Sequence, residues 1–213
     1  MIKIVVADDH VLTREGLKNR IQKEAIDMKI VDEASNASEL LKKIHAEQPD
    51  VVILDITLPD KNGLDVLKDI KINYPKIKVI VLSMHPEERY AVRAYKAGAS
   101  GYLSKDRENL TSELIRAIRV IISQNRRYVT KEVASQLAEY IQSSGFKKHL
   151  ELSDREFQVF CLIAMGKTIK EIAKQLSITI QTVYTYRNRA KEKLDLETDA
   201  DFTRYAIQHN LID

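Results

Sequence analysis

Residues 51–63 read VVILDITLPDKNG, an apolar run that ends at an aspartate and is followed by a proline and a glycine. Lys3–Ala7 and Lys78–Ser83 have the same continuously apolar character. Strands that are apolar on both faces are typical of a parallel sheet covered by helices on both sides. The stretch therefore predicts a buried parallel strand, with polar residues at its carboxyl end.

Strand-like runs and amphipathic stretches alternate over residues 1–125. The predicted strands are Lys3–Ala7, Lys29–Ala34, Val51–Asp55, Lys78–Ser83 and Gly101–Leu103. The predicted helices are Leu12–Glu24, Asn36–Glu47, Leu64–Asn73, Glu87–Ala97 and Leu110–Ser123. This alternation predicts an α/β fold, a doubly wound parallel five-stranded sheet built from five βα units.

The remainder of the chain is predicted to be helical. We expect a linker helix within residues 126–146 and an all-α domain over 147–213. Helix starts with capping boxes are predicted where a hydroxyl or amide side chain precedes an acid by three residues, at Asn36, Ser153, Thr168 and Thr198. The short turn Ser177–Thr179, followed by a helix over Ile180–Leu194, favours a helix-turn-helix.

The overall charge is nearly balanced, with 34 basic and 31 acidic residues and a net of +3. That balance excludes an acidic tail protein and a strongly basic coat protein, and 44% hydrophobic residues exclude intrinsic disorder. The charge is unevenly spread, because residues 147–194 have a net of +5 and residues 195–213 a net of −4. Positive charge on the predicted helix-turn-helix favours binding to a phosphate backbone.

The sequence also indicates the cellular compartment of the protein. Its apolar runs are far shorter than the roughly 18 residues that a membrane span needs, so we expect no membrane association. Two aspartates among the first ten residues argue against a signal peptide. The single cysteine, Cys161, lies in an apolar helical pattern and is expected in a core. Together these features indicate the reducing cytoplasm.

Three carboxylates are predicted to meet at one edge of the sheet. Asp8 and Asp9 follow the first strand, and Asp55 ends the third. Ligands of doubly wound sheets bind at the carboxyl ends of the strands, where the strand order reverses. Like charges gathered there require a cation, and oxygen ligands suit Mg²⁺ or Mn²⁺. Ser83 and Lys105, at two further strand ends, complete a phosphoryl-binding set in which one carboxylate is the nucleophile.

Other readings of this edge are weaker. A dinucleotide site needs a glycine-rich turn after the first strand, and no glycine occurs there before Gly16. His10 and His85 have no metal-ligand spacing to a partner, so we expect them at the rim of the site.

These motifs together resemble a response-regulator receiver domain over residues 1–125. The resemblance is carried by Asp8-Asp9, by residues 55–63, by Val81-Leu82-Ser83, by residues 98–102 and by Ser104-Lys105. It implies that Asp55 accepts a phosphoryl group, that Asp9 ligates Mg²⁺ directly, and that Asp8 acts mainly through water. It further implies that Thr57 ligates the metal through its backbone carbonyl and that Lys105 pairs with the phosphoryl group. Ser83 and Tyr102 are implied to be the switch pair.

The segment Leu152–Leu194 resembles a LuxR-type (NarL/FixJ-type) DNA-binding domain. The resemblance is carried by LSDRE at 152–156, AMGKT at 164–168, KEIA at 170–173, LSI at 176–178, TVYTYR at 182–187 and EKL at 192–194. It implies that the bases are read by Tyr184, Thr185 and Asn188, and that phosphates are contacted by Lys170, Thr182, Arg187, Arg189 and Lys193. The chain departs from the family's usual Asn, His and larger apolar residue at Ile169, Tyr186 and Ala190.

The two resemblances imply a two-component response regulator and transcription factor. A histidine kinase would phosphorylate Asp55, Tyr102 would turn inward, and the receiver would then form a homodimer that binds double-stranded DNA, with RNA polymerase as a further partner. The only catalysis implied is the chain's own phosphorylation and dephosphorylation.

Three alternatives stay open at this point. An aspartyl-phosphate hydrolase is disfavoured, because such enzymes carry a second aspartate where Thr57 stands. A helical output that binds protein or RNA is disfavoured by the positive charge of residues 147–194 together with the resemblance to a DNA-recognition helix. DNA binding that needs no phosphorylation is compatible with the sequence.

Overall fold

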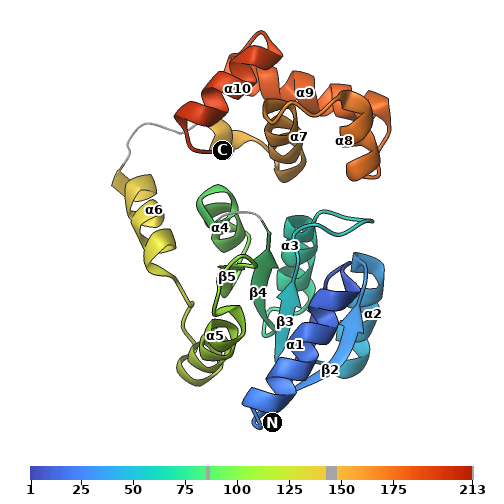
Figure 1. Cartoon of the computed structure of the whole chain (residues 1–213), viewed down its shortest axis with the longest axis vertical. Coiled ribbons are helices and arrows are strands. Elements are labelled where there is room, and N and C mark those ends of the chain that lie inside the picture. The colour runs from blue at the N-terminus through green and yellow to red at the C-terminus, as the bar shows by residue number, and fades with distance from the viewer. Residues whose placement is uncertain (85–86, 143–147, 213) are drawn as a thin grey trace. The chain divides into compact units, whose positions relative to one another are not determined.

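The computed structural model describes residues 1–84, 87–142 and 148–212 of the chain (Figure 1). The chain forms two compact units, Met1–Leu137 and Ala138–Asp213. The division falls inside the predicted linker, and the predicted domain bounds 1–125, 126–146 and 147–213 stay predictions.

The first unit is built on a five-stranded sheet. The strands are β1 (Ile2–Ala7), β2 (Met28–Ala34), β3 (Val51–Leu54), β4 (Lys78–Ser83) and β5 (Gly101–Ser104). All neighbours pair in parallel, in the order β2-β1-β3-β4-β5. The strand order reverses between β1 and β3, so the predicted doubly wound sheet is confirmed, with its switch point where the carboxylates were expected.

Five helices connect and cover the strands. They are α1 (Val11–Glu24), α2 (Ala37–Glu47), α3 (Gly63–Asn73), α4 (Glu87–Lys96) and α5 (Leu110–Gln124). Apolar residues of α1 and α5 form one buried cluster with residues of all five strands, on one face of the sheet. On the other face α3 contacts both α2 and α4. Helices on both faces explain why β3 is buried along its whole length.

A further helix, α6 (Lys131–Gln142), lies where the linker helix was predicted. The strand-like segment before it is joined to the sheet, because Tyr128 forms a parallel bridge with Gly101. Residues 143–147, which contain the predicted end of the linker helix, lie outside the described residues.

The second unit is helical, as predicted. It contains a 3₁₀ turn, η1 (Lys148–Glu151), and the helices α7 (Asp154–Ala164), α8 (Ile169–Gln175), α9 (Ile180–Leu194) and α10 (Asp199–Gln208). Ser153, Thr168 and Thr198 each begin a helix with a complete capping box, which confirms three of the four predicted boxes. Cys161 is buried in the core of this unit, as expected.

The fourth predicted capping box is wrong in one half. The side chain of Asn36 caps α2 by accepting from the Glu39 amide at 2.9 Å. The Glu39 carboxylate, however, accepts from the Ser35 amide at 2.8 Å and from the Ser35 hydroxyl at 3.0 Å. The hydroxyl adds a second hydrogen bond at Ser35, and this explains why the carboxylate does not bind the Asn36 amide.

Among the described residues, the helices are all too short or too polar to span a membrane.

Candidate functional site

Two carboxylates and one ammonium group meet at the carboxyl edge of the sheet. Asp8 follows β1, Asp55 follows β3 and Lys105 follows β5, and the side chains of the three are 2%, 3% and 6% exposed. The Lys105 Nζ lies 2.6 Å from Asp8 Oδ2 and 2.5 Å from Asp55 Oδ2. The topology therefore brings together three of the predicted site residues.

Burial and ion pairing act against each other in this group. Burial raises the pKa of Asp55, and the neighbouring Lys105 ammonium opposes that rise. Burial alone would lower the pKa of Lys105, but the attraction of Asp55 and Asp8 outweighs it and raises that pKa. Lys105 therefore stays protonated and balances part of the negative charge.

The loop after β3 fixes the other oxygen of Asp55. The Thr57 amide donates to Asp55 Oδ1 at 2.9 Å. An antiparallel bridge between Thr57 and Asn62 closes the loop, and the Asn62 side chain caps α3 by accepting from the Leu64 amide at 2.8 Å. The carboxylate of Asp55 is thus held at both oxygens, one by an ammonium and one by a backbone amide.

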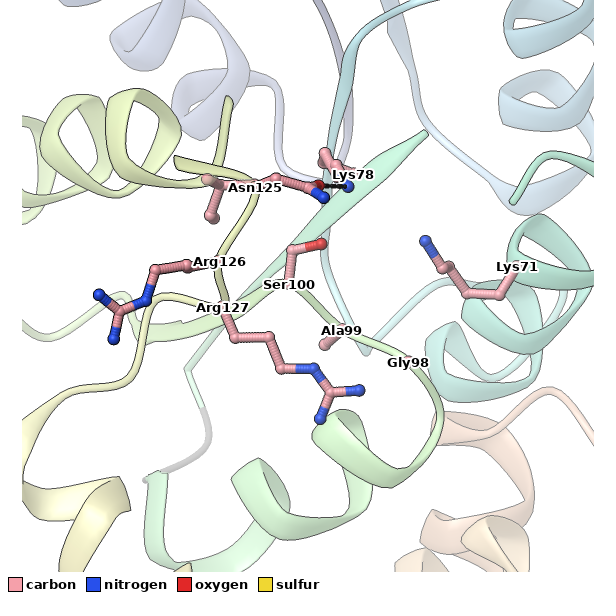
Figure 2. Close-up of a pocket in the computed structure, with 9 residues that line it drawn as sticks. Lys71, Lys78, Gly98, Ala99, Ser100, Asn125, Arg126 and Arg127 are labelled. Carbon is pink, nitrogen blue, oxygen red and sulfur yellow. Dashed lines mark hydrogen bonds between the residues drawn. The ribbon is translucent and has the colours of Figure 1, made fainter. Parts of the chain in front are cut away.

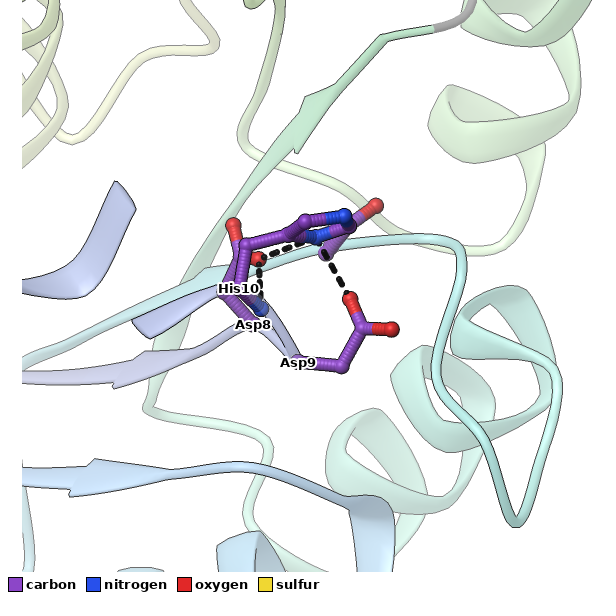
Figure 3. A group of neighbouring side chains, drawn as sticks. Asp8, Asp9 and His10 are labelled. Atoms are coloured by element: carbon purple, nitrogen blue, oxygen red, sulfur yellow. Dashed lines mark hydrogen bonds and ion pairs between the residues drawn. The ribbon is translucent and has the colours of Figure 1, made fainter. Parts of the chain in front are cut away.

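Asp9 and His10 form the open side of the cluster (Figure 3). The Asp9 side chain is 36% exposed, and its Oδ1 lies 2.8 Å from the Nδ1 of His10. Asp8, Asp9, His10 and Asp55 each offer one ligand atom, and these atoms lie within 4.8 Å of one another. The three carboxylates fit Mg²⁺ or Mn²⁺, which prefer oxygen ligands. The His10 side chain is 63% exposed, which suits the rim position expected of it.

The predicted switch pair lies on the two neighbouring strands β4 and β5. Ser83 ends β4, is fully buried, and its carbonyl accepts from the Lys105 amide at 2.8 Å. Tyr102 on β5 is in register with Val81 and is also fully buried. The structure therefore places Tyr102 in the inward position that the sequence analysis expects after phosphorylation. His85 lies outside the described residues.

One residue near the site was missed by sequence reasoning. Asp60, in the same loop as Thr57, accepts from the amides of Ala37 at 2.8 Å and Ser38 at 3.0 Å, at the amino end of α2. These bonds hold the loop against a second helix. The sequence did offer a signal for this contact. An acidic residue in a loop beyond a strand end can accept hydrogen bonds from the free backbone amides at the start of a nearby helix.

A second candidate site is the surface of α9 and α8 in the second unit. The buried residues of α9 are Val183, Ala190 and Leu194, which confirms its predicted inward face.

The opposite side of α9 exposes four residues that were predicted to contact DNA, namely Tyr184, Thr185, Asn188 and Arg189. Lys170 is exposed on α8, and the half-buried Thr182 lies in the first turn of α9. Such an amphipathic helix, preceded by a short helix and a tight turn, suits a major groove.

Two predicted phosphate contacts already have acidic partners within the unit. Arg187 Nε lies 2.8 Å from Asp199 Oδ1, and Lys193 Nζ lies 2.6 Å from the buried Glu156. Either residue can contact a phosphate only by sharing or leaving its carboxylate. Sequence reasoning also missed Lys174, which is exposed one helical turn after Lys170 on α8.

Comparisons with protein families match both units. Residues 4–119 match the response regulator receiver domain, and residues 150–206 match the luxR family of bacterial regulatory proteins. These spans contain the carboxylate cluster and the α8–α9 surface.

Curated proteins and solved structures match over nearly the whole chain. The chain is 33% identical to the response regulator UvrY of Escherichia coli strain K12, covering 99% of this chain and 96% of that protein. It is 32% identical to the response regulator GacA of Pseudomonas syringae pv. syringae strain B728a, covering 100% and 99%. A structure of RcsB from Salmonella enterica serovar Typhimurium, bound to promoter P1flhDC in the presence of phosphomimetic BeF3-, is 26% identical with a TM-score of 0.66. That match covers 96% of this chain and 97% of RcsB.

Proposed function

Because the chain belongs to the response regulators that join a receiver domain to a LuxR-type DNA-binding domain, we propose that phosphorylation of Asp55 switches its binding to DNA. The phosphoryl donor is a sensor histidine kinase. One observation carries the proposal: the buried Asp55 carboxylate lies 2.5 Å from the Lys105 ammonium at a sheet edge, beside the buried Asp8 and the more exposed Asp9.

The chemistry follows from how Asp55 is held. A bond forms between an Asp55 oxygen and phosphorus, while the phosphorus–nitrogen bond of the kinase's phosphohistidine breaks. The Thr57 amide and the Lys105 ammonium fix the direction of the carboxylate, so that little reorientation is needed before attack. After transfer, Lys105 pairs with the new phosphoryl oxygens in place of the carboxylate oxygen.

A divalent cation belongs to this site. Asp8, Asp9 and Asp55, with the backbone carbonyl of Thr57, would hold Mg²⁺ or Mn²⁺, and the cation would neutralise charge on the phosphoryl oxygens. Asp9 offers the most accessible carboxylate for the cation, and Asp8 would act mainly through water. Ser83 then donates its hydroxyl to a phosphoryl oxygen, and the inward position of Tyr102 is stabilised.

The output is proposed to be a DNA-bound homodimer. A dimer presents two copies of α9 to two half-sites, which raises affinity without any new contact to a single site. The bases are read by Tyr184, Thr185 and Asn188. Phosphates are contacted by Lys170, Thr182 and Arg189, and also by Arg187 and Lys193 once these two have left their carboxylate partners. The structure of RcsB bound to promoter DNA in the presence of a phosphomimetic supports a link between the phosphorylated state and DNA binding. We further propose that the protein acts in the cytoplasm, that RNA polymerase is a partner, and that the only catalysis is the chain's own phosphorylation and dephosphorylation.

Mass spectrometry of the full chain tests the phosphorylation. After incubation with Mg²⁺ and a small phosphodonor, the wild-type chain should gain the mass of one phosphoryl group, and Asp55→Asn should gain none. Asp106→Asn is the matched control, because Asp106 is an exposed carboxylate one residue from Lys105, and it should be modified like wild type. Equal modification of the Asp55→Asn chain would contradict the proposal.

A further inference from the structure

The first unit also contains a pocket, at the opposite edge of the sheet from the carboxylate cluster. It lies at the amino end of β4 and β5, with a volume of about 240 Å³ (Figure 2). Its lining comes from the end of α3, the start of β4, the residues before β5, and α5 with the segment after it. The lining residues are Lys71, Lys78, Gly98, Ala99, Ser100, Ile121, Asn125, Arg126 and Arg127. Nothing in the proposed phosphorylation uses this pocket.

The lining contains four cations and no carboxylate. Lys71 donates to the carbonyls of Ile77 at 2.9 Å and Pro75 at 3.3 Å, and Lys78 donates to the Asn125 side-chain oxygen at 2.6 Å. These partners are neutral, so they do not cancel the positive charge. Within the described residues none of the four cations forms an ion pair.

The charges of the cations lie close enough together to affect the pKa of Lys71. Burial lowers the pKa of Lys71, and repulsion from Lys78 and Arg127 lowers it further. In Figure 2, Lys71 and Arg127 extend from opposite sides of the pocket, with Gly98, Ala99 and Ser100 between them. An anion placed there would relieve a repulsion that the folded unit otherwise retains.

The pocket is built from anchored segments. The chain after α5 is fixed by the Tyr128 amide, which donates to the Ser100 carbonyl at 2.8 Å, and by the Tyr95 hydroxyl, which donates to the Tyr128 carbonyl. Arg127 also lies over the Tyr95 ring, 6.0 Å from its centroid. The stem of Lys71 packs against Gly98, where a Cβ would lie 3.0 Å from its Cγ, and its ammonium is bonded to two carbonyls. Binding therefore requires little ordering of the chain.

We propose that this pocket binds a small phosphate-bearing anion, such as pyrophosphate or a phosphate ester. The volume is below the range of roughly 300–1,000 Å³ that is usual for drug-sized ligands, so it favours a small one. Ammonium and guanidinium groups contributed by three segments of the lining suit several phosphate oxygens at once. The Ser100 side chain adds a hydroxyl at the pocket wall.

Residue-resolved NMR of the full chain tests the site, with pyrophosphate as the probe and a chelator present to remove divalent cations. We expect saturable shifts of the Gly98, Ala99 and Ser100 amides. Arg127→Gln should weaken binding about tenfold, as the loss of one charge-assisted hydrogen bond does. The matched control is Lys23→Gln, which removes an exposed cation of α1 outside the lining and should bind like wild type.

Several outcomes would overturn the proposal. Shifts confined to the basic residues of α8 and α9 would mean that the anion binds the DNA-facing surface. Equal weakening by Lys23→Gln would mean that only net charge matters, and the absence of shifts at residues 98–100 would exclude the site. Phosphatidic acid vesicles distinguish a lipid headgroup from a free phosphate: we expect the chain not to cosediment with them, and Arg127-dependent cosedimentation would contradict the assignment to a small free anion.

Discussion

Lys105 decides the charge balance of the carboxylate cluster. Its ammonium pairs with two carboxylates that are both almost fully buried. Removing one partner from a buried ion pair leaves uncompensated charge, which usually costs more than the pair itself contributes. This residue therefore has a structural role as well as its proposed role as phosphoryl partner.

We predict that Lys105→Met destabilises the first unit by about 3 kcal/mol in the absence of divalent cations, because Asp8 and Asp55 then repel each other in a buried place. Mg²⁺ should restore part of that loss, since a cation that binds only the folded site stabilises it. Amide hydrogen exchange of β1 and β3, with and without Mg²⁺, measures both effects.

Lys61→Met is the control for this variant. Lys61 pairs with Asp69, and both side chains are well exposed, so the cost should stay below about 1 kcal/mol. Equal loss of protection in the two variants would show that Lys105 does not neutralise buried charge.

At the scale of elements, the loop after β3 and the start of α3 are in very close contact. A Cβ at Gly63 would lie 2.4 Å from the Asp55 carbonyl oxygen and 2.6 Å from the Ile56 Cα. Both neighbours are backbone atoms that cannot rotate away. The glycine is therefore required by close packing, and it fixes the position of Asp55 itself.

We predict that Gly63→Ala displaces the loop, destabilises the first unit by about 2 kcal/mol and slows phosphorylation. Gly16→Ala is the matched control, because nothing lies within 4 Å of its Cβ position in the middle of α1; it should stabilise the unit by about 0.5–1 kcal/mol. Thermal unfolding and the phosphorylation rate are the measurements. A Gly63→Ala chain that matches Gly16→Ala in both would contradict the packing argument.

On the α8–α9 surface, the residues proposed to read bases differ from those proposed to contact phosphates. We predict that Asn188→Ala costs about 1–3 kcal/mol on the preferred DNA sequence and little on other sequences. Lys170→Gln should instead weaken binding to all sequences alike and reduce the salt dependence by about one counterion. Titrations of specific and random duplexes over a range of salt concentrations distinguish the two, and an identical pattern for both variants would refute the assignment.

Sequence reasoning located these elements because their signals are local. The apolar run Val51–Leu54, the caps Ser153 and Thr168 and the inward face of α9 each follow from neighbouring residues. The carboxylate cluster could also be predicted, because parallel topology places strand ends together.

Partners that are distant in sequence could not be predicted in this way. The ion pairs Arg187–Asp199 and Lys193–Glu156 join different helices, and Asp60 reaches the start of α2. Each depends on packing that no local pattern encodes. The basic pocket was missed for the same reason, because its cations come from three separate segments.

At the scale of the whole molecule, a net charge of +3 conceals two opposite chemistries. An acidic cluster lies in the first unit, and a basic helix-turn-helix lies in the second. The central claim is that the state of Asp55 in one unit sets the DNA affinity of the other. A coupling of this kind is a free energy, typically 1–3 kcal/mol or about 5–150-fold in affinity.

The most direct test measures DNA binding by fluorescence anisotropy at fixed salt, for the wild-type chain and for Asp55→Ala, each with and without a phosphodonor and Mg²⁺. We predict that the phosphodonor tightens binding of the wild-type chain at least fivefold and leaves the DNA affinity of Asp55→Ala unchanged. Sedimentation of the same samples should show dimers only for the treated wild-type chain. Equal DNA affinity and equal dimerisation of the two chains in every condition would show that Asp55 does not control DNA binding.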